Sequence, residues 1–401
     1  MRVSHKRVSL AAAAAPPERR CRRLRQENAR KDCAMATTQA APRAPELVPP
    51  RAGLRFDLAV LVTSLWFFGG LLLDGWAHNH LDLSKEGFFT PYHAVFYSGF
   101  AALAAVLLVA TLRNRRPGMT WPQAIPAGYG RMALGIGIFA VGGALDMLWH
   151  IAFGVEQGTE ALFSPTHLLL AAGGATMMSG PITAGIARRH ERTWADQWPT
   201  LVPLSLFATL VTFFFMWAFT TGAAKEADPR LLYPHLPAAT LADVRDLRIG
   251  HGIAAVVIRS LIVVGFVTWA ARRIPLPFGA VTMLIAVPNV SIAAMLSPDP
   301  EAIGLALGAS LVAGIAGDVA LARYVDLNVA SWRSRAFGFG LPFVFWAVSM
   351  SLAYVIVGGF WWSPHVVYGV PVIAGICGLL FSLASEPWCG RRDSNPQPTS
   401  S

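Results

Sequence analysis

Ten apolar stretches of about 20 residues each run through most of the chain. A helix needs about 20 mostly apolar residues to cross a lipid bilayer. Backbone N–H and C=O groups need hydrogen-bond partners within the chain when they lie in lipid, so apolar stretches of this length fold as helices. The pattern predicts an all-α, polytopic integral membrane protein, a bundle of about ten transmembrane helices. The predicted spans are 57–78, 92–112, 132–151, 165–187, 200–222, 251–271, 277–296, 303–322, 337–360 and 367–386.

The formal charge of +10 is unevenly distributed along the 401 residues. Residues 1–55 hold 13 Lys and Arg against four Asp and Glu, residues 388–401 carry a net +1, and the transmembrane domain, 56–387, is neutral. Because the excess lies in the tails, it does not indicate a nucleic-acid partner. Both tails lack apolar periodicity and are predicted to be disordered. The sequence leaves open Met35 as an alternative start and read-through as the origin of 388–401.

The Lys and Arg residues of the loops predict how the spans are oriented. Loops after the second, fourth, sixth and eighth spans contain 12 of these residues, whereas the alternate loops contain five. Since basic loops stay in the cytoplasm, we expect both termini to be cytoplasmic. The chain is rich in Ala and Arg and poor in Lys, which favours a bacterial plasma membrane as its location. Eight of the ten His residues then lie at or near the outer side.

The first two predicted hairpins, 56–112 and 131–187, repeat one pattern of residues. Each copy reads Gly-Gly, then Asp-x3-His, then a short loop, then Glu-x2-Phe-[Ser/Thr]-Pro-x-His-x5-Gly. A shared pattern of this kind predicts an internal duplication. Its ionisable members are Asp74, His78, Glu86 and His93 in the first copy, and Asp146, His150, Glu160 and His167 in the second.

The spacing within each copy predicts where these side chains lie. Asp and His four residues apart share one helix face. Thr90 and Ser164 are expected to cap the next helix, with Pro at its first position and His93 or His167 at its third. Because a short loop brings the two helix ends together, we expect each hairpin to converge one Asp and two His.

Two His and one carboxylate form a ligand set for a divalent transition metal such as copper, zinc, iron or manganese. The candidate ligands are Asp74, His78, His93, Asp146, His150 and His167. Ionisable groups are costly inside membrane spans, which favours a functional role. Glu86 and Glu160 are the candidate catalytic bases, or further ligands. The alternative is that the Asp–His pairs are hydrogen-bonded structural pairs that hold no metal.

The order Asp-x3-His, then a second His on the next helix, resembles the motif in the C subunit of copper membrane monooxygenases, which oxidise methane or ammonia. The resemblance covers about 74–93 and 146–167. It implies a metal site, with copper as the metal. The present motif differs from that of the family in being duplicated and in having a longer gap before the last His.

Three further polar residues lie in predicted spans. His251 opens the sixth span at the outer side and is a candidate additional member of the site. Arg259 lies about two turns deeper in the same span, and Asp318 lies in the inner half of the eighth. We expect Arg259 and Asp318 to form a structural pair, with a proton or ion path as the alternative.

These observations support two classes of function. The first is a membrane metalloenzyme whose metal activates water or oxygen for attack on an apolar or lipid substrate entering from the bilayer. The second is a metal or proton-coupled transporter whose paired hairpins form an outward-facing loading site. A membrane protein with purely structural His–Asp pairs is the third alternative. The expected partners are the lipid bilayer and either a small apolar substrate or a metal ion, with the oligomeric state left open.

Overall fold

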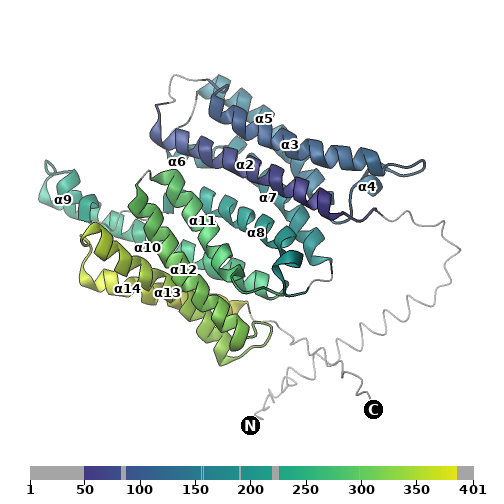
Figure 1. Cartoon of the computed structure of the whole chain (residues 1–401). Helices are drawn as coiled ribbons and strands as arrows, with labels where there is room; N and C mark the ends of the chain where they lie inside the picture. The colour runs from purple at the N-terminus through teal and green to yellow at the C-terminus, as the bar shows by residue number, and fades with distance from the viewer. Residues whose placement is uncertain are drawn as a thin grey trace, which may run out of the picture. The chain divides into compact units, whose positions relative to one another are not determined.

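The protein is an all-α, polytopic membrane helical bundle (Figure 1). The computed structural model describes residues 49–82, 87–154, 156, 158–188, 191–218, 225–297 and 299–385. The predicted tails, 1–55 and 388–401, therefore lie almost wholly outside the described residues, and so does Glu86.

Ten long helices make up the described part of the bundle. They are α2 (Leu54–His80), α3 (Pro91–Asn114), α5 (Gly130–Phe153), α7 (Pro165–Ile186), α8 (Trp194–Phe214), α10 (Ala238–Ala271), α11 (Ala280–Leu296), α12 (Pro300–Arg323), α13 (Trp332–Val357) and α14 (Pro364–Ala384). Short helices join some of them: α4 (Trp121–Ala124), α6 (Thr159–Phe163), η1 (Met216–Ala218), η2 (Lys225–Ala227) and α9 (Pro229–Leu232).

Among the described residues, nine helices are long and apolar enough to cross a membrane. Each corresponds to one predicted span. The remaining predicted span, 277–296, forms the apolar helix α11, which has only 17 residues. It begins late because Gly279 adopts a left-handed conformation (φ 92°) directly before it. A helix of 17 residues is at the lower limit for crossing a bilayer.

Two helices differ from the predicted spans in extent. The fifth span was expected at 200–222, but α8 runs from Trp194 to Phe214, because Thr193 caps its start by accepting a hydrogen bond from the Asp196 amide. The sixth was expected at 251–271, but α10 begins at Ala238 and has 34 residues. At 1.5 Å per residue this helix is about 51 Å long, so it extends well beyond a hydrocarbon core of about 30 Å.

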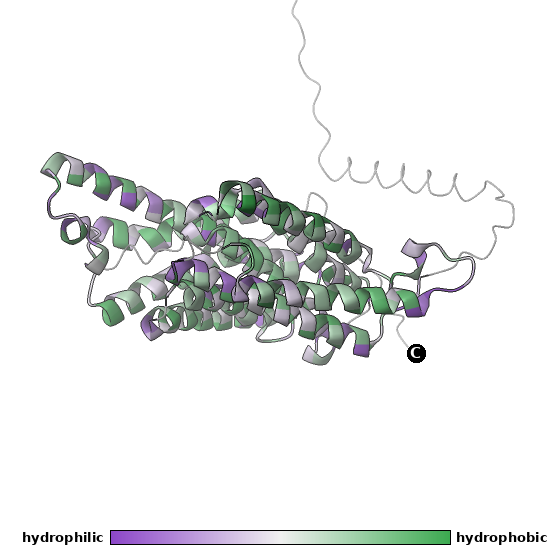
Figure 2. Cartoon of the chain, turned by 90° about the horizontal axis from the view of Figure 1, so that it is seen from above, coloured by the Kyte–Doolittle hydropathy of each residue, from purple (hydrophilic) through white to green (hydrophobic). Residues whose placement is uncertain are grey.

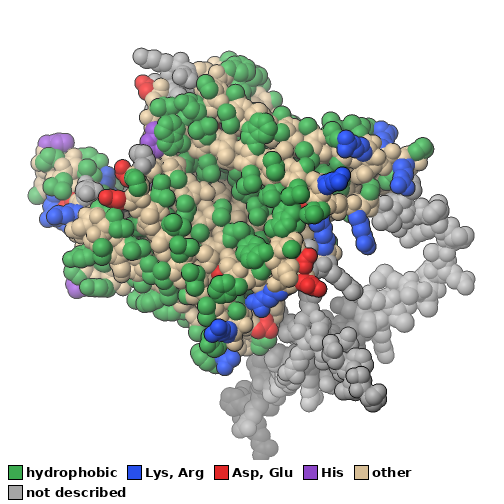
Figure 3. All heavy atoms as spheres, viewed as in Figure 1, with side chains coloured by type: hydrophobic (Ala, Val, Ile, Leu, Met, Phe, Trp, Pro, Cys, Tyr) green, Lys and Arg blue, Asp and Glu red, His purple; other side chains and the backbone are tan. Residues whose placement is uncertain are grey.

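The surface agrees with a membrane environment. Hydrophobic residues dominate the long helices (Figure 2), and hydrophobic side chains cover much of the face seen in Figure 3. Large apolar side chains are exposed along the helices, for example Val62 at 61% and Leu134 at 60%. Because so much exposed apolar surface is rare on soluble monomers, these faces are suited to contact lipid.

Two groups of buried apolar side chains form the interior. One lies among α2, α3, α5 and α7, and the other among α10, α12, α13 and α14. Helices α8 and α11 contribute to both: Leu201 and Ile285 to the second, Leu210 and Ile292 to the first. The four helices of the first two hairpins therefore pack on the rest of the bundle through α8 and α11.

Both hairpins bring their helices close at equivalent residues. A Cβ atom built on Gly70 would lie 2.5 Å from the Cα of Phe96, and one on Gly142 would lie 3.3 Å from the amide N of Leu170. Gly70 and Gly142 each precede the Asp of the motif by four residues, and Phe96 and Leu170 each follow its second His by three. Small residues here allow the backbones to approach closely.

An ion pair joins the two hairpins at the end opposite the motifs. Arg188 donates to both carboxylate oxygens of Asp57, at 2.6 and 2.9 Å, and the Tyr129 hydroxyl donates to the same carboxylate at 2.6 Å. Asp57 is only 5% exposed. These hydrogen bonds raise the pKa of Arg188, which lies beyond the end of α7, so its guanidinium remains charged. The contact connects the first turn of α2 to the end of α7.

Candidate metal centre

The first hairpin brings together Asp74, His78 and His93. Asp74 and His78 are four residues apart on the last turns of α2, and His93 lies on the first turn of α3. The Asp74 Oδ2 atom lies 3.5 Å from His93 Nε2 and 3.9 Å from His78 Nε2. One ligand atom from each residue lies within 4.8 Å of the others.

The second hairpin brings together Asp146, His150 and His167 in the same way. Asp146 and His150 end α5, and His167 opens α7. Each carboxylate oxygen of Asp146 faces one ring, with Oδ2 3.5 Å from His150 Nε2 and Oδ1 3.6 Å from His167 Nε2. The Asp146 and His150 side chains are each only 2% exposed.

Helix caps hold the second His of each hairpin in place. The predicted N-caps are confirmed: the hydroxyl of Thr90 accepts from the His93 amide at 3.1 Å, and that of Ser164 accepts from the His167 amide at 3.4 Å. Proline follows each cap at the first helical position. Because these hydrogen bonds satisfy an otherwise free helix amide, they set where each ring enters the site.

Backbone carbonyl groups determine which ring nitrogen carries the proton. His93 Nδ1 donates to the carbonyl of Phe88 at 2.6 Å, and His150 Nδ1 donates to the carbonyl of Gly154 at 3.2 Å. A carbonyl oxygen can only accept, so in neutral His the proton lies on Nδ1 and the Nε2 lone pair is free. This arrangement, in which the second ring nitrogen donates to a carbonyl, is typical of His that binds metal.

The distances around each carboxylate suit a shared cation. A carboxylate oxygen and an unprotonated Nε2 repel each other, and at 3.5 Å no hydrogen bond joins them for His93 in the first hairpin or His150 in the second. A metal ion bound tetrahedrally at about 2.1 Å from each atom separates its ligand atoms by about 3.4 Å. Three of the four carboxylate-to-imidazole separations are close to that value, and the fourth, from Asp74 to His78, is longer at 3.9 Å.

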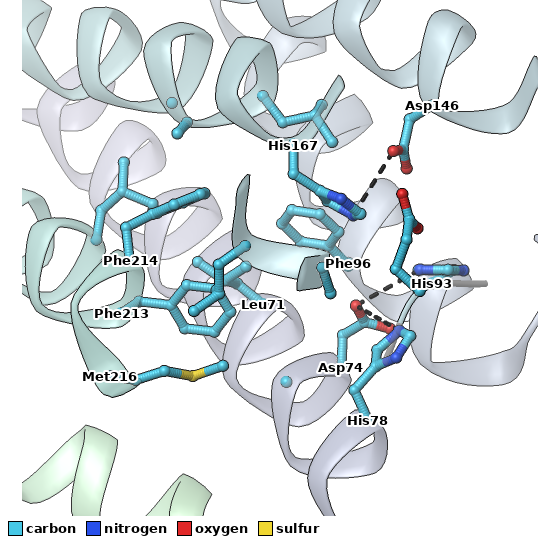
Figure 4. A pocket seen from close by; sticks show the side chains of 18 of the residues that line it. Leu71, Asp74, His78, His93, Phe96, Asp146, His167, Phe213, Phe214 and Met216 are labelled. Carbon is cyan, nitrogen blue, oxygen red and sulfur yellow. Dashed lines mark ion pairs between the residues drawn. The ribbon is translucent and has the colours of Figure 1, made fainter. Parts of the chain in front are cut away.

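Both triads line a single cavity (Figure 4). The volume open to the centre of a water molecule is about 90 Å³. The rings of His93 and His150, from different hairpins, have centroids 6.2 Å apart. Within the described part of the chain, three buried polar atoms of the cavity lining have no hydrogen-bond partner, Oδ1 of Asp74, Nε2 of His150 and Oε2 of Glu156. Such atoms are costly unless a ligand satisfies them.

An acidic residue that the repeat did not indicate also lines the cavity. Glu156 accepts a hydrogen bond from the Trp149 ring, and its Oε2 atom lies 3.4 Å from Nδ1 of His150. The shared pattern used Glu86 and Glu160 as its acidic loop residues and did not include Glu156, which aligns with Asp82 when both are counted back from the second His. The predicted Glu160 is exposed on α6, and it is not among the described residues that line the cavity.

The other polar residues singled out in the spans lie away from this cavity. His251 is exposed, and its Nε2 pairs with the carbonyl of Trp217 at 2.7 Å. Arg259 donates to the side chain of Asn289 and lies over the ring of Trp346. Asp318 accepts hydrogen bonds from the amides of Val281 and Thr282 at 3.0 and 3.1 Å and so caps α11. Asp318 therefore has a structural role in the bundle.

The rest of the cavity wall is mostly apolar, with Asn79 and Tyr97 as further polar lining residues. Leu71 comes from α2, and Phe213, Phe214 and Met216 come from the end of α8 and the turn that follows. Figure 4 shows these side chains on the side of the pocket away from Asp74, His78 and Asp146. Sequence analysis did not assign them to the site, because an apolar residue in an apolar span carries no local signal.

No protein-family model, curated protein or solved structure matches the chain. The resemblance to the copper membrane monooxygenases therefore remains one of motif only. The basis for a functional proposal is therefore the chemistry of the two triads and of the cavity that they line.

Proposed function

We propose that this membrane protein binds divalent transition-metal ions through its two His–His–Asp triads, one ion to each triad, within one shared cavity. The observation that carries the proposal is the pairing of a free Nε2 lone pair with a carboxylate oxygen in both hairpins. With neutral rings and no cation between them, these buried groups repel one another. The nitrogen and oxygen donors suit copper, zinc or iron.

We further propose that the centre is catalytic and acts on an apolar or lipid substrate. A bound metal would supply Lewis acidity and an activated water or oxygen ligand. The chain itself would orient the metal ligands through the carbonyl groups of Phe88 and Gly154. Glu156, beside His150, is placed to accept a proton at the edge of the cavity. The apolar wall would exclude bulk water.

The two hairpins are proposed to be copies of one duplicated unit. The matching contacts of Gly70 and Gly142 support this, as does a second pair of contacts, Gly99 with the Phe67 backbone and Gly173 with the Phe139 backbone. Phe67 and Phe139 each precede the Asp of the motif by seven residues. Unrelated hairpins would have no reason to share these offsets.

The triads are proposed to lie at the extracytoplasmic face of a bacterial plasma membrane, with both termini in the cytoplasm. The support is the excess of Lys and Arg in the loops at the opposite end of the bundle. A topology reporter fused after residue 158, in the loop between α5 and α7, tests the orientation. We expect the reporter to be active outside the cytoplasm, and cytoplasmic activity would refute this orientation.

Transport is the weaker alternative on structural grounds. A transported ion needs a chain of polar groups leading through the bundle. The two intramembrane candidates are engaged elsewhere, since Asp318 caps α11 and Arg259 contacts Asn289 and Trp346. These contacts favour a metal site confined to one end of the bundle.

Elemental analysis of detergent-purified protein after metal loading tests the proposal. We expect two ions per wild-type chain and a loss of both in the double variant His78→Ala plus His150→Ala. His235→Ala is the matched control, because His235 is an exposed loop residue that should leave the content at two. Size-exclusion chromatography establishes that each variant is folded. A metal-free wild-type protein after loading would refute the proposal and favour purely structural His–Asp pairs.

A further inference from the structure

The cavity that the triads line also has an apolar part, the apolar compartment, whose residues are not candidate metal ligands. It is formed by Phe213 and Phe214 of α8, Met216 of η1, Leu71 and Leu210. Leu71, Leu210 and Phe213 are each at most 8% exposed. Figure 4 shows this apolar group facing the same space as His167. The space is thus polar at the triads and apolar at the end of α8.

An apolar compartment of this kind binds water unfavourably. A buried cavity holds water only where two to four polar groups can bind it, and apolar cavities stay dry and accept apolar ligands. Pockets that bind small molecules are mostly apolar with a few polar groups that fix orientation. The arrangement here has that form, with the polar groups gathered at one end.

We propose that this compartment binds the hydrocarbon part of an amphiphilic ligand whose small oxygen-donor head coordinates at the triads. The inference rests on the proposed metal binding for the head group, and on the apolar wall for the tail. The proposal restricts the substrate to molecules that have both an oxygen-donor head and a hydrocarbon tail. A free amphiphile and a lipid cleavage product share this chemistry.

Two residues allow the compartment to be changed without touching a metal ligand. Gly174 lines it on α7, two turns beyond His167, and a Cβ atom there would lie 3.2 Å from the end of the Leu210 side chain. Gly174→Leu should therefore fill the compartment. Leu210→Ala should enlarge it from the opposite wall.

The test measures binding of n-alkyl hydroxamic acids of increasing chain length to metal-loaded protein by calorimetry. Transfer of one methylene group from water to an apolar site is worth about a fourfold gain in affinity. We expect about that gain per carbon in wild type until the compartment is full, and no gain in Gly174→Leu. In Leu210→Ala the gain should continue to longer chains. Partition into detergent is common to all three proteins and cancels in the comparison.

The outcomes separate this inference from the proposed function. If the proteins hold metal and all three show the same dependence on chain length, the apolar compartment is not the binding site and the inference is wrong. If the wild-type protein holds no metal, the proposed function fails first. If Gly174→Leu does not fold, Leu210→Ala still tests the inference. In that variant the affinity should keep increasing to longer chains than in wild type, and no such change would refute the inference.

Discussion

The two hairpins carry the same three ligands, but their carboxylates are held differently. Asp146 presents one oxygen to each His and also accepts a hydrogen bond from the Thr166 hydroxyl at 2.8 Å. Asp74 presents Oδ2 to both of its His residues, and its Oδ1 has no hydrogen-bond partner within the described segments. The second triad is thus the more completely supported of the two.

One sequence position accounts for much of this difference. The residue before the second His is Thr166 in one hairpin and Tyr92 in the other. A threonine hydroxyl at that position reaches the carboxylate across the hairpin. Outer partners of this kind typically change metal affinity by about 10- to 100-fold. Under the proposed metal binding, we predict that the second hairpin binds its ion more tightly and fills first.

The largest effect is expected from removing the carboxylate charge in each hairpin separately. Asp146→Asn should lose the tighter ion and Asp74→Asn the weaker one, each by more than about 100-fold in affinity, because a direct ligand matters more than its outer partners. Competition titration with a chromophoric chelator measures both binding steps, that of the tighter ion and that of the weaker ion. Loss of both ions in either single variant would show that the triads do not bind independently.

The hydroxyl of Thr166 provides the next test. Thr166→Val keeps the shape of the side chain and removes its donor, so Asp146 loses a hydrogen bond inside the bundle. We expect the affinity of the tighter site to fall by about 10- to 100-fold, which would bring the two sites together. Tyr92→Phe, at the equivalent position of the first hairpin, is the control and should change neither step. An unchanged tighter site in Thr166→Val would contradict the proposed cause of the difference.

Helix packing offers a test that needs no metal. A Cβ atom on Gly70 would meet the Phe96 backbone at 2.5 Å, whereas one on Gly142 would come no closer to its neighbours than 3.2 Å. Gly70→Ala should destabilise the protein by about 1 to 3 kcal/mol through overpacking, and Gly142→Ala should cost less. Thermal unfolding in detergent measures both. Gly69→Ala, with open space around the added atom, serves as the control, and equal losses in all three would refute the close approach.

The fold and the convergence of the six candidate ligands were largely predictable from sequence because both depend on local rules. Apolar stretches of the right length identify transmembrane helices, and the spacing of four places Asp74 and His78 on one helix face. The caps at Thr90 and Ser164 follow from a motif of four residues. These inferences use only neighbours along the chain or a repeat within it.

The residues that sequence analysis missed depend on tertiary contacts. Thr166 stands between Pro165 and His167 with nothing in the sequence to show that it reaches Asp146. Phe213 lies 46 residues after His167 and joins the cavity only because α8 packs on the first hairpins. Asp318 was singled out in the sequence, but its partners were not: it caps α11 through the packing of α12 against that helix.

Glu156 gives the smallest and most discriminating effect, since it lines the cavity, whereas the repeat pattern indicated Glu160 in the same hairpin. Glu156→Gln removes the negative charge 3.4 Å from His150 Nδ1, but that nitrogen keeps the Gly154 carbonyl as acceptor. We therefore expect a loss below about 10-fold in the affinity of the tighter site, at the low end for outer partners. Glu160→Gln should leave both sites unchanged because Glu160 is exposed. If Glu160→Gln weakens metal binding and Glu156→Gln does not, then the acidic residue that affects metal affinity is Glu160, as the repeat pattern predicts. The two hairpins would then be more alike than their contacts indicate.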